Sequence, residues 1–128
     1  MSHIVTIRTQ VRDIEALAAA CRRLGLSQPV QGTATLFSSR ATGQIVQLPG
    51  WTYPVVFDTA TGEAHYDTYN GAWGDQKELG KLLQRYAAEK AIIEARRAGH
   101  QVLEHSLPDG SIRLTIQAGG ASAEGGVA

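Results

Sequence analysis

The segment from residue 75 to residue 99 carries the strongest helical pattern in the chain and therefore limits its possible folds most. Asp75, followed three residues later by Glu78, gives a capping-box pattern behind a glycine-rich break. Gly99 supplies the stop, because glycine readily adopts the left-handed conformation that ends many helices. The apolar spacing between these signals predicts one long amphipathic helix, the longest element of the fold, with an inward stripe of Leu79, Leu82, Leu83, Tyr86 and Ile93.

The N-terminal segment changes from a period of two to a helical period. Residues 3–11 alternate, with His3 on the mostly apolar side, and this predicts a strand whose inner face includes His3. Asp13 is a plausible N-cap for a following helix, and Gly25 a plausible end. The stripe expected to be buried on this helix comprises Ile14, Leu17, Ala18, Cys21 and Leu24.

The remaining segments read as short strands joined by turns. The turn-forming stretches are "SRATG", "TATG" and "LPDG", and the proline-rich "LPGWTYP" is expected to be an ordered loop. The strands expected around them span residues 33–38, 43–48, 54–58, 63–69, 102–106 and 111–117.

These elements predict an α+β fold in the order β-α-β-β-β-β-α-β-β, with two helices packed on one face of a mainly antiparallel sheet. The length of 128 residues suits one domain, which we expect to span residues 1–117. Residues 118–128 are rich in glycine and alanine, and we expect them to form a flexible tail.

Composition restricts the partners and the location that we expect. Lysine and arginine number 12 and aspartate and glutamate number 12, so no net field favours nucleic acid. No apolar run approaches the roughly 20 residues that cross a bilayer, and charged residues interrupt the N-terminus early, so we expect a cytoplasmic protein without membrane contact. The single cysteine, Cys21, is expected to be a small buried core residue, and no cofactor is expected.

Two blocks of sequence cover roughly half the chain: "MSHIVTIRTQVRDIEALAAACRRLG" and "QRYAAEKAIIEARRAGHQVLEHSLPDGSIRLTIQ". They resemble the two ends of the hypothetical chloroplast reading frame thirty-five family, small proteins of unknown function from red-algal plastids, cyanobacteria, other bacteria and some phages. Ile4 and His100 depart from the aromatic residues common at those positions, and residues 27–50 match little. The resemblance implies a fold unit and no activity. The matching residues are the opening Met-Ser-His, Ile7, Thr9, Gln10, Leu17, Gly25, Gln84, Arg85, Tyr86, Ala87, Gly99, Val102 and the run 109–112.

Aromatic residues in loops form the first candidate site. Trp51 and Tyr53 lie in the loop before a predicted strand, and Trp73 lies just before the long helix. Large aromatic side chains often anchor a protein partner, although they also cover the edges of hydrophobic cores. We expect Trp51, Tyr53 and Trp73 to form a partner-binding surface if they are exposed.

A polar pocket around His3 is the second candidate. If the long helix crosses the first strand, His3 could meet Gln84, Arg85 and Tyr86, either as a buried imidazole with a hydrogen-bond partner or as part of a ligand site. In the second case Arg85 would hold an anion, and His3 with Tyr86 would act as a general acid/base pair. A metal site would need further ligands such as His65, Asp67 or His105, and no ligand motif supports one.

No catalytic motif stands out, so we expect a non-enzymatic accessory or adaptor protein that acts by binding another protein. Cys21 lies within a helix, away from the helix start that would lower its pKa, and no serine lies in a G-x-S-x-G elbow. The alternative is a small ligand-binding domain or enzyme that uses the pocket of His3 and Tyr86. A metal-binding or nucleic-acid-associated role ranks third.

Overall fold

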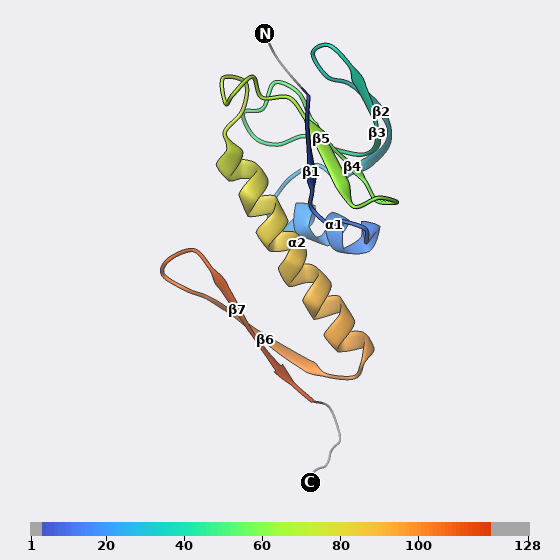
Figure 1. The fold of residues 1–128 in the computed structure, drawn as a ribbon. Coiled ribbons are helices and arrows are strands. Elements are labelled where there is room, and N and C mark those ends of the chain that lie inside the picture. The colour runs from blue at the N-terminus through green and yellow to red at the C-terminus, as the bar shows by residue number, and fades with distance from the viewer. Residues whose placement is uncertain (1–3, 119–128) are drawn as a thin grey trace. The chain divides into compact units, whose positions relative to one another are not determined.

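The computed structural model describes residues 4–118, and the chain divides into two compact units, Met1–Tyr86 and Ala87–Ala128 (Figure 1). The α+β class and the predicted order of elements are confirmed. The seven strands are β1 (Val5–Arg8), β2 (Val30–Thr35), β3 (Arg40–Val46), β4 (Val55–Asp58), β5 (Glu63–Tyr66), β6 (Gln101–Ser106) and β7 (Ile112–Gln117). The two helices are α1 (Ile14–Arg23) and α2 (Gln76–Arg97), and α2 is the longest element.

The first unit contains a five-stranded antiparallel sheet in the order β1-β5-β4-β3-β2. Its central strand β4 is buried on both faces, because Val55, Val56 and Phe57 all have an exposed fraction of 0%. Val56 belongs to a small cluster on one face, together with Leu36 and Ala41. Val55 and Phe57 point to the opposite face by alternation, and both are fully buried there.

Local capping signals place both helices as the sequence predicts. Asp13 accepts a hydrogen bond from the backbone N–H of Ala16, and Gly25 has a φ of 72° at the end of α1. Asp75 accepts from the backbone N–H of Lys77, and Gly99 has a φ of 83° at the end of α2. The buried face of α1 is shifted, however, because Ile14 is 50% exposed whereas Ala16 and Ala20 are fully buried.

The first strand is shorter than the alternating pattern predicts. It ends at Arg8, because Gln10 adopts a left-handed φ of 60° that interrupts the extended backbone. The backbone N–H groups of Thr9 and Gln10 both donate to the carbonyl of Gly62 in the β4–β5 turn. The prediction of a continuous strand over residues 3–11 is therefore wrong beyond Arg8.

The β2–β3 hairpin turns earlier than predicted and curls over the sheet. The turn spans residues 36–39, so the predicted turn "SRATG" mostly belongs to strand β3. From residue 44 onward β3 pairs with β4, but residues 40–43 pair with β2 alone. Gly43 lies at this change, and a Cβ there would approach the carbonyl oxygen of Phe57 to 2.3 Å, so only glycine allows this contact.

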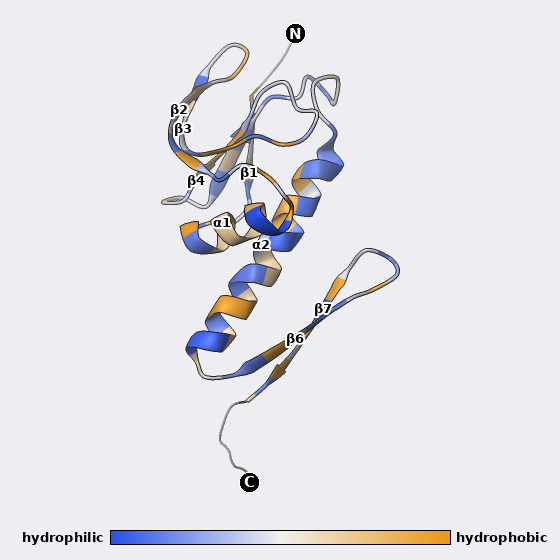
Figure 2. Ribbon diagram, turned by 180° about the vertical axis from the view of Figure 1, so that it is seen from behind, coloured by the Kyte–Doolittle hydropathy of each residue, from blue (hydrophilic) through white to orange (hydrophobic). Residues whose placement is uncertain are grey.

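The second unit consists of the end of α2 and a separate two-stranded sheet of β6 and β7. In Figure 2, polar and apolar segments alternate along α2 and along both strands. The turn between the strands is the predicted "LPDG", where Gly110 has a φ of 88°. The side-chain hydroxyl of Ser111 and then its backbone N–H donate to the carboxylate of Asp109, and these hydrogen bonds lower the pKa of that carboxyl group. The predicted tail from residue 119 onward lies outside the described residues.

Candidate binding surface

Four aromatic side chains from three loops of the first unit form one cluster, which we call the aromatic patch: Phe37, Tyr53, Tyr69 and Trp73. The ring of Trp73 lies at its centre, with centroid distances of 4.9 Å to Tyr69, 5.2 Å to Phe37 and 5.6 Å to Tyr53. Phe37 and Tyr53 also meet edge to face at 6.5 Å. These separations are those of rings in contact, so the four side chains make one continuous surface.

The curled hairpin brings Phe37 to this surface. Phe37 lies in the β2–β3 turn, next to the fully buried Leu36. Leu36 packs with Ala41 and Val56 under the curl, and Tyr53 packs against the same cluster. The cluster of small apolar residues on this sheet face therefore fixes the hairpin tip beside the loop that carries Tyr53.

The loop between β5 and α2 supplies the other two rings. Tyr69 and Asn70 adopt left-handed φ values of 50° and 55°, a conformation that asparagine tolerates but that is unfavourable for a bulky residue such as tyrosine. Asp67 supports this turn, because its carboxylate accepts the backbone N–H of Tyr69 at 3.1 Å. The backbone N–H of Trp73 then donates to the carbonyl of Thr68 at 2.8 Å. Such strained backbone persists only where the surroundings hold it, and it concentrates at functional sites.

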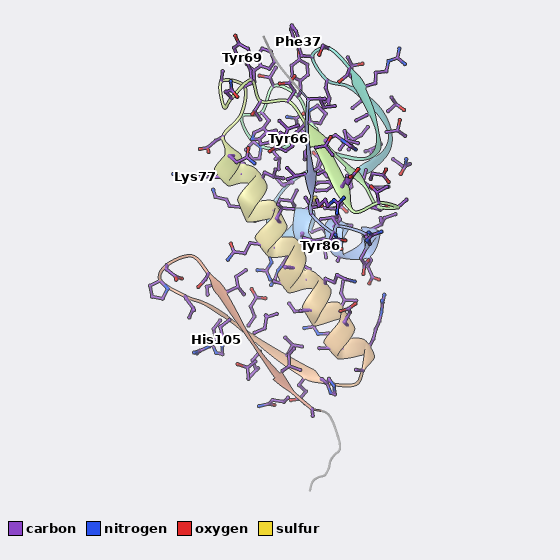
Figure 3. All side chains as sticks on the ribbon, viewed as in Figure 1. Phe37, Tyr66, Tyr69, Lys77, Tyr86 and His105 are labelled. Carbon is purple, nitrogen blue, oxygen red and sulfur yellow. The ribbon has the colours of Figure 1, made fainter. Side chains whose placement is uncertain are left out.

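The aromatic patch is accessible and carries no charge. Phe37 is 54% exposed and Tyr69 is 40% exposed, while Tyr53 and Trp73 are half-buried. Figure 3 shows Phe37 and Tyr69 at the same end of the first unit, away from Tyr86. The rings touch one another, so a ligand would have to lie across them and not between them. Two of the predicted residues, Tyr53 and Trp73, are thus brought together, and Phe37 and Tyr69 are additions that the sequence analysis did not include.

Trp51, the third predicted residue, lies in the core and not in the aromatic patch. Its exposed fraction is 5%, and its ring packs against Tyr66 at 5.5 Å. The indole N–H donates to the backbone carbonyl of Asp75 at 2.9 Å. A Cβ on Gly74 would lie 2.7 Å from the Trp51 ring, so the backbone itself presses on this ring. Trp51 therefore anchors the start of α2 to the sheet.

Three residues of the predicted polar pocket, Gln84, Arg85 and Tyr86, lie in the described part of the chain. His3 lies outside the described residues, so its role stays a prediction. The Tyr86 hydroxyl accepts the backbone N–H groups of Arg12 and Asp13, at 3.1 Å and 3.0 Å. Tyr86 thus contacts the segment that follows β1, whereas His3 precedes that strand. Gln84 is exposed while Arg85 and Tyr86 are buried.

Two cavities of the first unit are lined by none of Gln84, Arg85 and Tyr86, although Tyr69 of the aromatic patch lines the larger one. The larger has a volume of about 310 Å³ and lies between the start of β1, the end of β5 and the loop that carries Tyr69. Its lining residues are Val5, Tyr66, Thr68, Tyr69, Asn70, Gly71 and Gln76. The smaller, of about 150 Å³, is lined by Leu24, Leu26, Leu48, Pro49, Glu78 and Lys81.

The groups that could support metal or thiol chemistry are dispersed or buried. Among residues 4–118, no three or more His, Cys, Asp or Glu side chains form a group that could hold a metal ion. His65, one of the possible ligands, instead shares a hydrogen bond with the Thr6 hydroxyl at 2.9 Å. The prediction that Cys21 is a buried core residue is confirmed, and burial raises the pKa of its thiol to about 11. This is opposite to the shift that activates a nucleophilic cysteine.

No protein-family model, no curated protein and no solved structure matches this chain. The resemblance to the hypothetical chloroplast reading frame thirty-five family therefore stays a prediction. Over the described part of the chain, neither helix is long and apolar enough to cross a membrane.

Proposed function

We propose that this protein is a non-enzymatic accessory or adaptor protein that binds another protein through the aromatic patch. The observation that carries the proposal is the convergence of four aromatic side chains from three loops onto one exposed surface. Tyrosine and tryptophan bury much apolar area at a small cost in side-chain entropy, and they are enriched among the residues that dominate binding energy.

The chemistry of the surroundings favours a protein partner over nucleic acid. None of the direct chain neighbours of the four patch residues is charged, and half of them, Ser38, Thr52, Thr68 and Asn70, are polar. A surface that binds nucleic acid by stacking also needs a positively charged groove for the phosphates. An uncharged rim around an aromatic centre is instead typical of protein recognition, because polar rim groups pair with the partner at little electrostatic cost.

The test compares two single variants in affinity purification from the native host at near-native expression. Trp73→Ala removes the central ring of the patch, and Ile14→Ala removes a 50% exposed apolar side chain outside it. We expect the amount of each protein that copurifies with the wild type to fall at least tenfold with Trp73→Ala and to stay unchanged with Ile14→Ala. Retention of the same partners by a folded Trp73→Ala protein would contradict the proposal.

Binding of a small ligand is the second candidate, and the cavity of about 310 Å³ favours it. That volume lies at the lower end of the range for ligand sites. The Tyr66 hydroxyl and the Gln76 amide meet in its wall at 3.1 Å and could orient a polar ligand. Mass spectrometry of the native protein would reveal a bound compound, and Gln76→Leu should release it without loss of the protein partners.

A further inference from the structure

The outer edge of strand β2 has no paired strand among the described residues. Strand β2 is the last strand of the five-stranded sheet. Natural proteins usually protect such edges with charged residues, proline or a bulge. The sequence of β2, "VQGTAT", contains neither a charge nor a proline, and the opposite edge strand β1 ends in Arg8.

The outward backbone groups of β2 belong to Gln31, Thr33 and Thr35. In the hairpin the N–H of Leu36 donates to the carbonyl of Ser39, which makes that pair a hydrogen-bonded one. Hydrogen-bonded and non-hydrogen-bonded pairs alternate along an antiparallel ladder, so every second residue turns its N–H and C=O outward. The side chains agree with this alternation of backbone pairs. Thr33 and Thr42 face each other, and their hydroxyl groups hydrogen-bond at 2.8 Å. Side chains approach this closely where the backbone groups of the two facing residues are not bonded to each other.

The two most exposed large apolar residues of the described chain lie near the two ends of this same strand. Val30 begins β2 with an exposed fraction of 62%, and Phe37 follows its last residue by two positions with 54%. If such a strand pairs antiparallel with a copy of itself, each end meets the opposite end of the partner strand. The apolar residue near one end is then covered by the apolar residue near the other end of the copy.

We infer that β2 pairs antiparallel with β2 of a second copy of this chain, about a two-fold axis at Thr33. Thr33 then faces the Thr33 of the second copy, and Gln31 faces Thr35, so that all outward backbone groups are paired. Gly32 faces Ala34, which suits the close approach of a non-hydrogen-bonded pair. Val30 comes opposite Leu36 and beside Phe37, so the exposed apolar residues at the strand ends cover each other.

The charges are compatible with this self-pairing. On the face of Gln31, Thr33 and Thr35, the neighbouring β3 residues are Gln44, Thr42 and Arg40, so Arg40 is the one charged side chain among them. Arg40 pairs with Thr35 at the hairpin end. In the antiparallel arrangement the two copies of Arg40 lie at opposite ends of the paired strands and do not repel each other. This inference extends beyond the proposed function, because the pairing is made by the backbone of β2 and, of the four residues of the aromatic patch, involves Phe37 alone.

Thr33→Lys tests the pairing, with Thr42→Lys as the matched control. Both variants lose the Thr33–Thr42 hydrogen bond and place one lysine on the same sheet face, but only Lys at position 33 meets its own copy at the axis. By sedimentation analysis of the full chain over a range of concentrations, we expect a weak wild-type dimer. Its dissociation constant should rise at least about tenfold in Thr33→Lys and change less than about twofold in Thr42→Lys.

A second pair of variants keeps the test decisive if a lysine disturbs folding. Facing residues of a hydrogen-bonded antiparallel pair have Cα atoms about 5.5 Å apart, within the range that a disulfide spans. With an added oxidant, Thr33→Cys should form a disulfide-linked dimer, whereas Thr42→Cys should not.

A wild type that stays monomeric at all concentrations, equal dissociation in both lysine variants, or no preference for cross-linking at position 33 would overturn the inference. Trp73→Ala should leave the dimer intact, so this test and that of the proposed function fail separately.

Discussion

Trp51 and Trp73, the two tryptophans of the chain, illustrate two uses of the same residue type. Trp51 is 5% exposed, donates its indole N–H to the carbonyl of Asp75 and packs on Tyr66. Trp73 is half-buried and lies among three rings, two of which are well exposed. The two tryptophans even belong to connected loops, because the backbone N–H of Thr52 donates to the carbonyl of Trp73 at 2.8 Å.

The difference shows which aromatic residues are needed for the fold. The core pair of Trp51 and Tyr66 holds the start of α2 against the sheet, and its polar atoms are hydrogen-bonded within the protein. The aromatic patch instead lies at the surface, where Phe37 and Tyr69 are exposed and Tyr53 and Trp73 are half-buried. We therefore expect changes in the core pair to alter stability and changes in the patch to alter binding.

The largest effect on stability is expected for Trp51→Ala. Removal of a buried tryptophan leaves a cavity and an unpaired carbonyl, which should lower the free energy of unfolding by about 3–5 kcal/mol. Trp73→Ala should cost about 1 kcal/mol, because it loses ring contacts at a half-buried position. Denaturant unfolding of both variants measures the difference, and equal losses would remove the distinction between core pair and patch.

Gly74→Ala tests the core pair by overpacking. The added methyl group would lie 2.7 Å from the Trp51 ring, so we expect a loss of about 1–3 kcal/mol in the free energy of unfolding. Gly80→Ala is the matched control in α2, where a Cβ meets nothing within 4 Å. That change should stabilise the protein by about 0.5–1 kcal/mol through helix propensity. A neutral Gly74→Ala in thermal unfolding would show that the Trp51 ring is free to move.

Tyr86→Phe compares a buried hydroxyl with one in the patch. The Tyr86 hydroxyl accepts two backbone N–H groups just before α1, and its loss should cost about 1–2 kcal/mol of stability. Tyr53→Phe in the patch should change the free energy of unfolding by less than about 0.5 kcal/mol. Urea unfolding of both variants checks this, and the reverse order would refute a structural role for Tyr86.

The smallest effect at neutral pH is expected from the ionisation of the buried thiol of Cys21. Its pKa is raised to about 11 from 9.0, so the folded state keeps the proton that the unfolded state releases. Stability is therefore unaffected well below pH 9 and falls between pH 9 and pH 11, by up to roughly 2–3 kcal/mol, since one pKa unit corresponds to about 1.4 kcal/mol. Cys21→Ala removes this contribution. If wild type and variant lose stability in parallel over that range, the thiol does not ionise on unfolding.

The sequence predicted the features that depend on neighbouring residues. Asp13, Gly25, Asp75 and Gly99 mark the helix ends through local hydrogen bonds and backbone conformation, so each could be recognised from its own segment. The order of the elements and the "LPDG" turn follow from the same kind of signal.

The features that sequence reasoning missed depend on residues far apart in the chain. Gly43 suggested a turn, yet its role is to let β3 approach the carbonyl of Phe57. Beyond Gly43 the β2–β3 hairpin leaves β4, and this brings Phe37 to Trp73. The residues around Phe37 in the sequence therefore did not indicate that it belongs to the patch. For Tyr69 a signal existed, because the following Asn-Gly pair is typical of a turn with positive φ values. Trp51 and Tyr53 are two residues apart, yet Trp51 is buried and Tyr53 is half-buried, a difference that arises from tertiary packing.

Acrylamide quenching of tryptophan fluorescence tests the central contrast most directly. Trp73→Phe retains Trp51 as the single fluorophore, and Trp51→Phe retains Trp73, each with an aromatic ring at the changed position. The account predicts a quenching constant several-fold higher for Trp73, in the aromatic patch, than for Trp51, in the core. Equal quenching of the two tryptophans in folded variants, or stronger quenching of Trp51, would contradict it.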